Sequence, residues 1–267
     1  MKKRIFRWIK ILVVIYCVVG ITFYYLQDKL LFRPQPLLAG EQYHFRSPFI
    51  EVNIPFNQSS NLNIIQFPTT GKTKGVVLYF HGNRKNIGHY ENFVPDFTNN
   101  GYEVWMMDYP GYGKSTGEFS EQRIYDWALL LYKLSRKRFS PDSIVIYGKS
   151  MGSGIAAQLA SVRDTRRLIL ETPYYSFPSV IGQYAPVYPW NKMIHFKVPT
   201  YQYLQRVTAP VTIFQGTADG VIRHSNASSL KPFLKPGDEF ISIEGGSHND
   251  LHSFNLFRQK LDSVLSR

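Results

Sequence analysis

The segment 148–152 has residue types that could carry out nucleophilic catalysis: it reads Gly-Lys-Ser-Met-Gly, a G-x-S-x-G pattern. The apolar run 143–147 before it is typical of a buried parallel strand, and the run 155–160 after it favours a helix. A serine on such a strand-to-helix turn is held with its hydroxyl exposed above the sheet. We therefore expect Ser150 to attack an acyl carbonyl. A glycine-rich turn with an ordinary helix-capping serine is the alternative. Lys149 could suggest a Ser–Lys dyad, but adjacent residues on this turn point apart.

A serine hydroxyl is a weak nucleophile, so Ser150 needs a base within hydrogen-bond reach and an acid that orients this base. Asp219 follows the apolar run 211–215, and His248 follows the run 240–243. Serine, acid and histidine thus occur in the chain order that accompanies this turn. Because the carboxyl ends of parallel strands meet at one edge of a sheet, we expect the three side chains to lie together there.

Three other residues compete for these roles. Glu171 ends an apolar run and could replace Asp219 as the acid, but the turn around Asp219 favours Asp219. His252 lies one helical turn after His248, and we expect it to be an ordinary helix residue. We expect His81 to be structural and to shape the loop after the run 75–80.

The oxyanion of a tetrahedral intermediate needs preorganised N–H donors. The backbone N–H of Met151, directly after the nucleophile, should be one donor, and the N–H of Asn83 the other. Gly82 allows the backbone of that loop to approach closely. Arg84 and Lys85 follow directly and could hold an anionic group of a substrate, although a solvated pair is slightly favoured.

Eight apolar runs of strand length alternate with helical segments. They are residues 49–55, 62–67, 75–80, 102–107, 143–147, 167–170, 211–215 and 240–243. The first two resemble an antiparallel pair, and the helical segments include 120–136 and 251–265. This alternation predicts an α/β fold with a mainly parallel sheet covered on both faces. The stretch 173–207, rich in Tyr and Pro, follows the sixth strand, and we interpret it as a small cap. A long structural connection is the alternative.

The N-terminus resembles a membrane anchor. Residues 11–27 carry no charge, and a spanning helix needs roughly 17–25 apolar residues. Basic residues precede this run, so the N-terminus should stay cytoplasmic and the rest of the chain should lie across the membrane. A cleaved signal peptide is the alternative, but no A-x-A-like cleavage site follows. We expect residues 1–27 to form a basic segment and signal-anchor helix, 28–48 a proline-containing connector, and 49–267 the α/β domain.

Composition narrows the function classes for these 267 residues, whose net charge is +12. Five positive charges lie in the first ten residues and the others are dispersed. This pattern disfavours nucleic-acid binding and favours an anionic membrane surface, with a merely solvated basic surface as the alternative. Cys17 is the single cysteine, so an internal disulfide is excluded. No histidine spacing suggests a metal site, and we expect no metal or cofactor.

Taken together, these motifs resemble the α/β-hydrolase superfamily, and most closely its N-terminally membrane-anchored serine hydrolases. The matching segments are QDKLLFRP at 27–34, FHGN at 80–83, DYPGYGKS at 108–115, the turn 148–152, GTAD at 216–219 and SHND at 247–250. Dehalogenases and epoxide hydrolases of similar fold carry aspartate at the turn, and dienelactone hydrolases carry cysteine, so Ser150 argues against these. Arg84 and Lys85 stand where relatives usually have small residues.

The resemblance implies a mostly parallel eight-stranded sheet and a serine hydrolase with the triad Ser150, Asp219 and His248. Carboxylic esters or thioesters of an acyl or lipid-like substrate are the expected bonds, with the domain on the non-cytoplasmic side of the membrane. A serine peptidase or amidase of the same fold is one alternative. A non-catalytic, membrane-anchored scaffold is the other, although a scaffold has no physical need for an acid, a base and a nucleophile in register.

Overall fold

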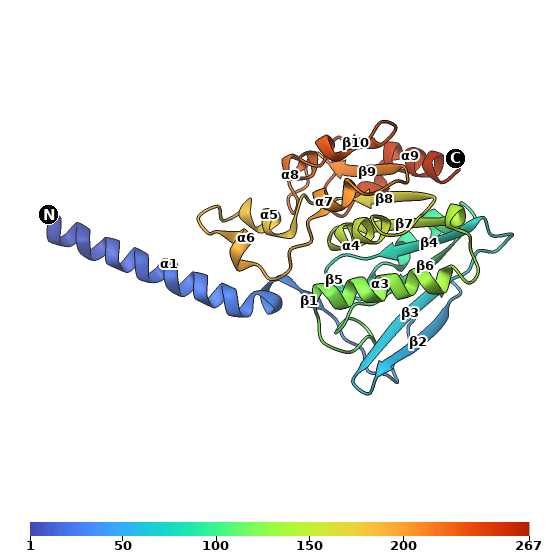
Figure 1. Ribbon diagram of the computed structural model, residues 1–267, viewed down its shortest axis with the longest axis horizontal. Coiled ribbons are helices and arrows are strands. Elements are labelled where there is room, and N and C mark those ends of the chain that lie inside the picture. The colour runs from blue at the N-terminus through green and yellow to red at the C-terminus, as the bar shows by residue number, and fades with distance from the viewer. Residues whose placement is uncertain (267) are drawn as a thin grey trace.

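A sheet of eight strands forms the centre of the computed structural model, which describes residues 1–266 (Figure 1). The strands are β2 (Ile50–Asn57), β3 (Ser60–Phe67), β4 (Gly75–Phe80), β6 (Tyr102–Met107), β7 (Ile144–Lys149), β8 (Arg167–Glu171), β9 (Val211–Gly216) and β10 (Glu239–Ile243). Their order in the sheet is β10-β9-β8-β7-β4-β6-β3-β2. The β2–β3 and β3–β6 pairs are antiparallel, and the other five pairs are parallel. The predicted fold class is confirmed.

Helices cover both faces of this sheet. The structure describes α1 (Lys2–Leu31), α2 (Pro95–Thr98), α3 (Glu121–Ser135), α4 (Met151–Ala160), α5 (Phe177–Gly182), α6 (Trp190–Met193), α7 (Thr200–Leu204), α8 (His224–Ser228) and α9 (Asn255–Ser266). Alternate side chains of β4 point to opposite faces. Val76 and Leu78 join the core under α3 and α4, while Val77 and Tyr79 join the core under α2 and α9. A parallel strand buried on both faces is therefore apolar throughout.

The predicted helices are present with small differences at their ends. In α3, the side chain of Ser120 accepts a hydrogen bond from the Arg123 N–H and caps the helix. The closing segment, expected as one helix over 251–265, begins with a short 3₁₀ turn, Leu251–Ser253, and α9 follows. Phe254 adopts an extended conformation, with φ −87° and ψ 132°, which separates the two.

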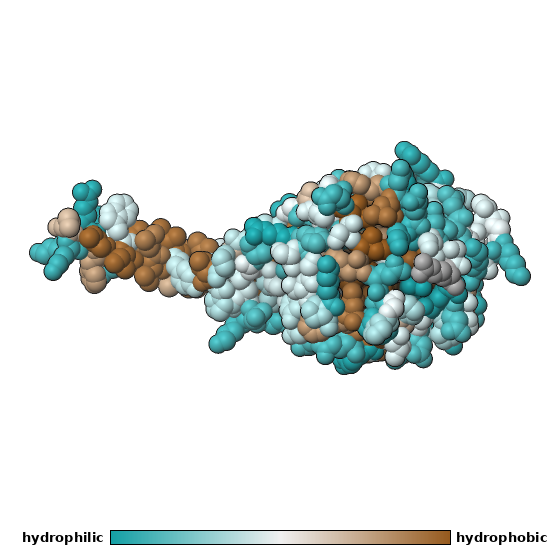
Figure 2. Space-filling model, turned by 90° about the horizontal axis from the view of Figure 1, so that it is seen from above, coloured by the Kyte–Doolittle hydropathy of each residue, from teal (hydrophilic) through white to brown (hydrophobic). Residues whose placement is uncertain are grey.

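The N-terminal helix is longer than expected. It runs from Lys2 to Leu31, past the expected end at residue 27, and is long and apolar enough to cross a membrane. Figure 2 shows its apolar side chains projecting from the body of the molecule. After α1, the short strand β1 (Arg33–Pro34) pairs in parallel with β5 (Arg84–Lys85). The connector thus leads the chain past the loop that follows β4.

The stretch 173–207 contains three short helices, α5 to α7, and no strand among its described residues. It leaves the sheet after β8, the sixth of these eight strands along the chain, and returns at β9. It lies beside the C-terminal half of α1 (Figure 1). We call residues 173–207 the cap.

Candidate active site

Ser150 occupies a strained turn between β7 and α4. Its backbone has φ 52° and ψ −120°, an unfavourable region for a residue with a Cβ. Two close approaches require the flanking glycines: a Cβ on Gly148 would lie 2.4 Å from the Gly152 carbonyl oxygen, and a Cβ on Gly152 would lie 2.0 Å from the Phe80 carbonyl oxygen. The turn therefore holds the half-buried Ser150 side chain between the ends of β7 and β4.

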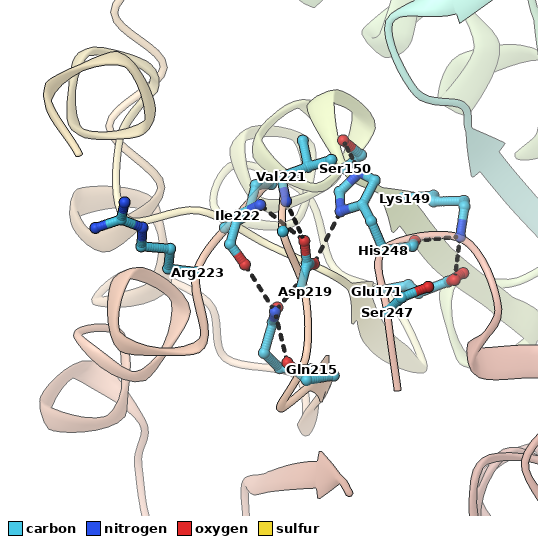
Figure 3. Close-up of polar contacts among 12 residues, drawn as sticks. Lys149, Ser150, Glu171, Gln215, Asp219, Val221, Ile222, Arg223, Ser247 and His248 are labelled. Atoms are coloured by element: carbon cyan, nitrogen blue, oxygen red, sulfur yellow. Dashed lines mark hydrogen bonds and ion pairs between the residues drawn. The ribbon is translucent and has the colours of Figure 1, made fainter. Parts of the chain in front are cut away.

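The predicted base and acid lie next to Ser150. Ser150 Oγ is 2.9 Å from His248 Nε2, and His248 Nδ1 is 2.8 Å from Asp219 Oδ2 (Figure 3). His248 follows β10 and Asp219 follows β9, so three strand ends of one sheet edge supply the three groups. The fold thus brings together the three residues that were predicted from the sequence.

Four donors surround the Asp219 carboxylate. The backbone N–H groups of Val221 and Ile222 each donate to Oδ1 at 2.8 Å, while Gln215 Nε2 donates to Oδ2 at 3.1 Å beside His248. Burial would raise the pKa of Asp219, but the hydrogen bonds from His248, Ile222 and Val221 outweigh it and lower the pKa. Asp219 is therefore held ionised and in a fixed orientation.

The loop after β4 passes close to Ser150. A Cβ on Gly82 would lie 3.6 Å from Ser150 Cβ. Asn83 is held from both sides: its Nδ2 donates to the Leu31 carbonyl at 2.7 Å, and its own carbonyl accepts from Tyr112 Oη at 2.9 Å. Met151 is the first residue of α4, where a backbone N–H has no partner within the helix. The N–H groups expected to bind an oxyanion therefore belong to two segments that flank Ser150.

His81, Arg84 and Lys85 lie outside this constellation. His81 is fully buried, and its Nε2 lies 3.3 Å from Asp108 Oδ1. The backbone of Arg84 and Lys85 pairs with the connector strand β1, and their side chains are exposed. The two basic residues thus join the connector to the loop after β4.

Glu171 and His252, the alternative acid and base, belong to a separate network next to the site. Glu171 is fully buried and contacts Lys149, Tyr147 and His252. Lys149 points away from Ser150 (Figure 3), and its Nζ donates to the His248 carbonyl at 3.5 Å. Burial would raise the pKa of Glu171, but the charges of Lys149 and His252 lower it instead. This network supports the loop that carries His248.

Gln215 and the Lys149–Glu171 pair were not assigned these roles from the sequence. Each is a polar residue at or near the carboxyl end of a mostly apolar strand, a signal that could have identified them. Their partners come from other segments, so only the tertiary structure defines the contacts. Among residues 1–266, no group of three or more histidine, cysteine or acidic side chains could hold a metal ion.

Comparison with known proteins identifies the superfamily and the fold of the chain. A family model described as serine aminopeptidase, S33 matches residues 71–203. An α/β-hydrolase domain-containing protein 17C of Xenopus tropicalis is 28% identical over 198 residues, which cover 71% of this chain and 61% of that protein. The chain belongs to the α/β-hydrolase superfamily. Protein 17B of Homo sapiens is 27% identical over 199 residues, 73% of this α/β-hydrolase and 67% of the human protein.

Solved structures show the same fold at low identity. An esterase of Pyrococcus furiosus has a TM-score of 0.68 at 16% identity, covering 88% of this α/β-hydrolase and 97% of the esterase. A monoacylglycerol lipase of Paleococcus ferrophilus has a TM-score of 0.60 at 17% identity, and the match covers 77% of this α/β-hydrolase and 98% of the lipase. The chain spans about three fifths, 61%, of the length of the Xenopus tropicalis protein.

Proposed function

We propose that this α/β-hydrolase is a membrane-anchored serine hydrolase that cleaves carboxylic esters or thioesters with acyl or lipid-like groups. One observation carries the proposal: a continuous chain of contacts from Ser150 Oγ to His248, at 2.9 Å, and from His248 to Asp219, at 2.8 Å. The similarity to α/β-hydrolase domain-containing proteins and to an esterase fold supports the reaction class.

The reaction proceeds by acyl transfer. Ser150 Oγ attacks the acyl carbonyl while its proton passes to His248 Nε2, and Asp219 stabilises the imidazolium through Nδ1. The tetrahedral intermediate collapses: the bond to the alcohol or thiol breaks, and His248 returns the proton to this leaving group. Water then attacks the acyl-Ser150 ester while His248 takes a proton from it. The bond between Ser150 Oγ and the acyl carbon breaks, His248 returns the proton to Ser150 Oγ, and the carboxylic acid is released.

The oxyanion of each intermediate is bound by the backbone N–H groups of Met151 and Asn83. Each such donor typically contributes about 2.7–4 kcal/mol to transition-state stabilisation. The contacts of Asn83 with Leu31 and Tyr112 hold its segment in place before the substrate arrives. These donors are therefore already oriented, which is the condition for strong electrostatic stabilisation.

The helix α1 is the proposed anchor, with its basic N-terminus cytoplasmic and the hydrolase domain on the opposite side. Its length and apolar composition are the support for this placement. An enzyme held at a bilayer meets substrates that carry acyl chains, which is why lipid-like esters are the preferred substrate class.

An activity-based probe tests the mechanism. We expect a fluorophosphonate to label the wild-type protein and to fail with Ser150→Ala. The matched control is Ser161→Ala at the other end of α4, where the hydroxyl donates only to the Gln158 carbonyl; its labelling should equal that of the wild type. Absence of labelling in the wild type would favour the non-catalytic scaffold.

A peptidase is the second candidate, because the matching family model is described as a serine aminopeptidase. A panel of acyl esters of increasing chain length, with aminoacyl amides alongside, separates the two. Preference for long acyl esters supports the lipid-like substrate, and faster cleavage of the amides would favour the peptidase.

A further inference from the structure

The cap packs against α1 through an aromatic contact near the middle of the helix. Tyr16 stacks on Tyr188, with ring centroids 4.4 Å apart and an interplanar angle of 9°. The Tyr16 hydroxyl donates to the Val187 carbonyl at 3.0 Å, and the Tyr188 hydroxyl donates to the Tyr16 carbonyl at 2.9 Å. Gly20 leaves room for the same ring, because a Cβ there would lie 2.9 Å from Tyr188 Cε1.

The contact continues toward the C-terminal end of α1. Phe23 meets Trp190 edge-to-face at 4.9 Å. The buried Gln27 donates to the Met193 carbonyl at 3.1 Å and accepts from the His195 N–H at 2.7 Å. Residues 16, 20, 23 and 27 follow the spacing of a single helix face. One continuous side of α1 is therefore covered by the cap.

The depth of this interface follows from helix geometry. At 1.5 Å per residue, the path from Tyr16 to Gln27 rises by about 16 Å, close to half of the roughly 30 Å hydrocarbon core of a bilayer. The uncharged run is 11–27. Residues 11–15 alone are too few to span, so any membrane-spanning placement of α1 includes the part that the cap covers. The cap segment on this face must then lie at the same depth.

The tip of the cap has a composition suited to lipid. Residues 184–190 read Tyr-Ala-Pro-Val-Tyr-Pro-Trp and carry no charge. Val187 and Tyr184 are 66% and 54% exposed. The two prolines have no N–H group that hydrocarbon would leave unsatisfied, and tyrosine and tryptophan favour the membrane interface.

We propose that the cap tip, residues 184–190, inserts beside α1 into the membrane leaflet on the side of the hydrolase domain, where lipid acyl chains cover it. The inference rests on the proposed anchor. A hollow in the cap is lined by Tyr175, Tyr188, Trp190 and Tyr201, among others. Tyr188 and Trp190 line this hollow and also contact α1. The hollow would therefore receive acyl-bearing molecules directly from this leaflet.

Depth-dependent fluorescence tests the insertion in the full-length protein. In a Cys17→Ser background, Val187→Cys is labelled with an environment-sensitive fluorophore and reconstituted in phosphatidylcholine vesicles. The matched control is Leu256→Cys, which is 44% exposed on α9 at the end of the domain opposite to α1 (Figure 1). We expect blue-shifted emission at 187 and severalfold stronger quenching by acyl-chain-brominated lipids than at 256.

Two measurements on the same vesicles separate the possible failures. Carbonate extraction reports the anchor, and fluorophosphonate labelling of Ser150 reports the hydrolase site. Retention in carbonate with equal, water-like emission at 187 and 256 overturns the insertion alone. Release by carbonate overturns the anchor and the insertion with it, while labelling of Ser150 would still support the hydrolase.

Discussion

At the scale of single residues, the site depends on how Asp219 is held. Its carboxylate accepts from two backbone N–H groups, from Gln215 and from His248, and these bonds lower its pKa despite burial. An ionised carboxylate at this position selects the His248 tautomer with its proton on Nδ1 and a free Nε2 toward Ser150. The orientation of His248 is therefore set by groups that never touch a substrate.

Asp219→Asn should lower kcat for ester hydrolysis by roughly 10³–10⁴-fold, because an amide can donate to Nδ1 and favours the wrong tautomer. Steady-state kinetics on a soluble ester measures the effect. Asp126→Asn, an exposed carboxylate on α3, is the control and should leave kcat unchanged. A loss of less than tenfold in Asp219→Asn would contradict the assigned role.

At the scale of elements, the turn between β7 and α4 is held by close packing against β4. The backbone of Gly152 approaches the Phe80 carbonyl, and Ser150 is strained. Beneath this turn, β7 and β8 supply the buried Lys149–Glu171 pair, which His252 and Asp96 extend to α2. Secondary-structure elements far apart in the chain thus meet next to the turn that carries Ser150.

Gly152→Ala should both destabilise the protein, by about 1–3 kcal/mol, and reduce labelling of Ser150, because its Cβ overlaps a backbone oxygen that cannot move freely. Thermal unfolding in detergent and probe labelling measure the two effects. Gly71→Ala is the control, since no atom lies within 4 Å of its Cβ position. Equal stability of the two variants would be inconsistent with the tight turn.

The His252 network predicts a pH dependence of stability. Burial would lower the pKa of His252, but the charge of Glu171 and the bond to Asp96 raise it above its ordinary value of 6.5. The protonated histidine thus stabilises the folded state fully below pH 6.5, and this contribution is lost as pH rises through the raised pKa.

His252→Asn should therefore lower the unfolding midpoint more at pH 6 than at pH 9, relative to the wild type. Thermal unfolding in detergent across this range measures the difference. His44→Asn, an exposed histidine in the connector, should show no such dependence. A penalty for His252→Asn that is constant with pH would refute the charged network.

At the scale of the whole molecule, α1 and the cap form one unit. The connector passes from α1 to the loop after β4, where Leu31 accepts a hydrogen bond from Asn83. Phe32, just after the helix, packs against Phe177 and Phe196 of the cap. Helix α1, the cap and the loop after β4 are therefore in continuous contact, which joins the N-terminal helix to the candidate site.

The orientation of the chain can be tested with the single-cysteine variant Leu256→Cys in the Cys17→Ser background. We expect a membrane-impermeant maleimide to label it only from the non-cytoplasmic side, because the basic residues precede α1. Right-side-out and inside-out vesicles expose the two sides of the membrane to the maleimide in turn. Labelling from the cytoplasmic side would reverse the proposed topology.

Much of this architecture follows from local sequence patterns. Short apolar runs such as 75–80 and 211–215 are typical of strands that a sheet buries on both faces. Their alternation with helices predicts a mainly parallel sheet. Ser150, Asp219 and His248 could be nominated because each follows such a run, and parallel strands end at one edge of the sheet.

The tertiary structure decided what local patterns could not. Glu171 ends one buried strand and Asp219 follows another, yet only Asp219 lies within reach of His248, while Glu171 is neutralised by Lys149. No local sequence pattern indicates that the cap packs along α1 from Tyr16 to Gln27 either. Both depend on distances between residues far apart in the chain, and the packing of the folded chain determines those distances.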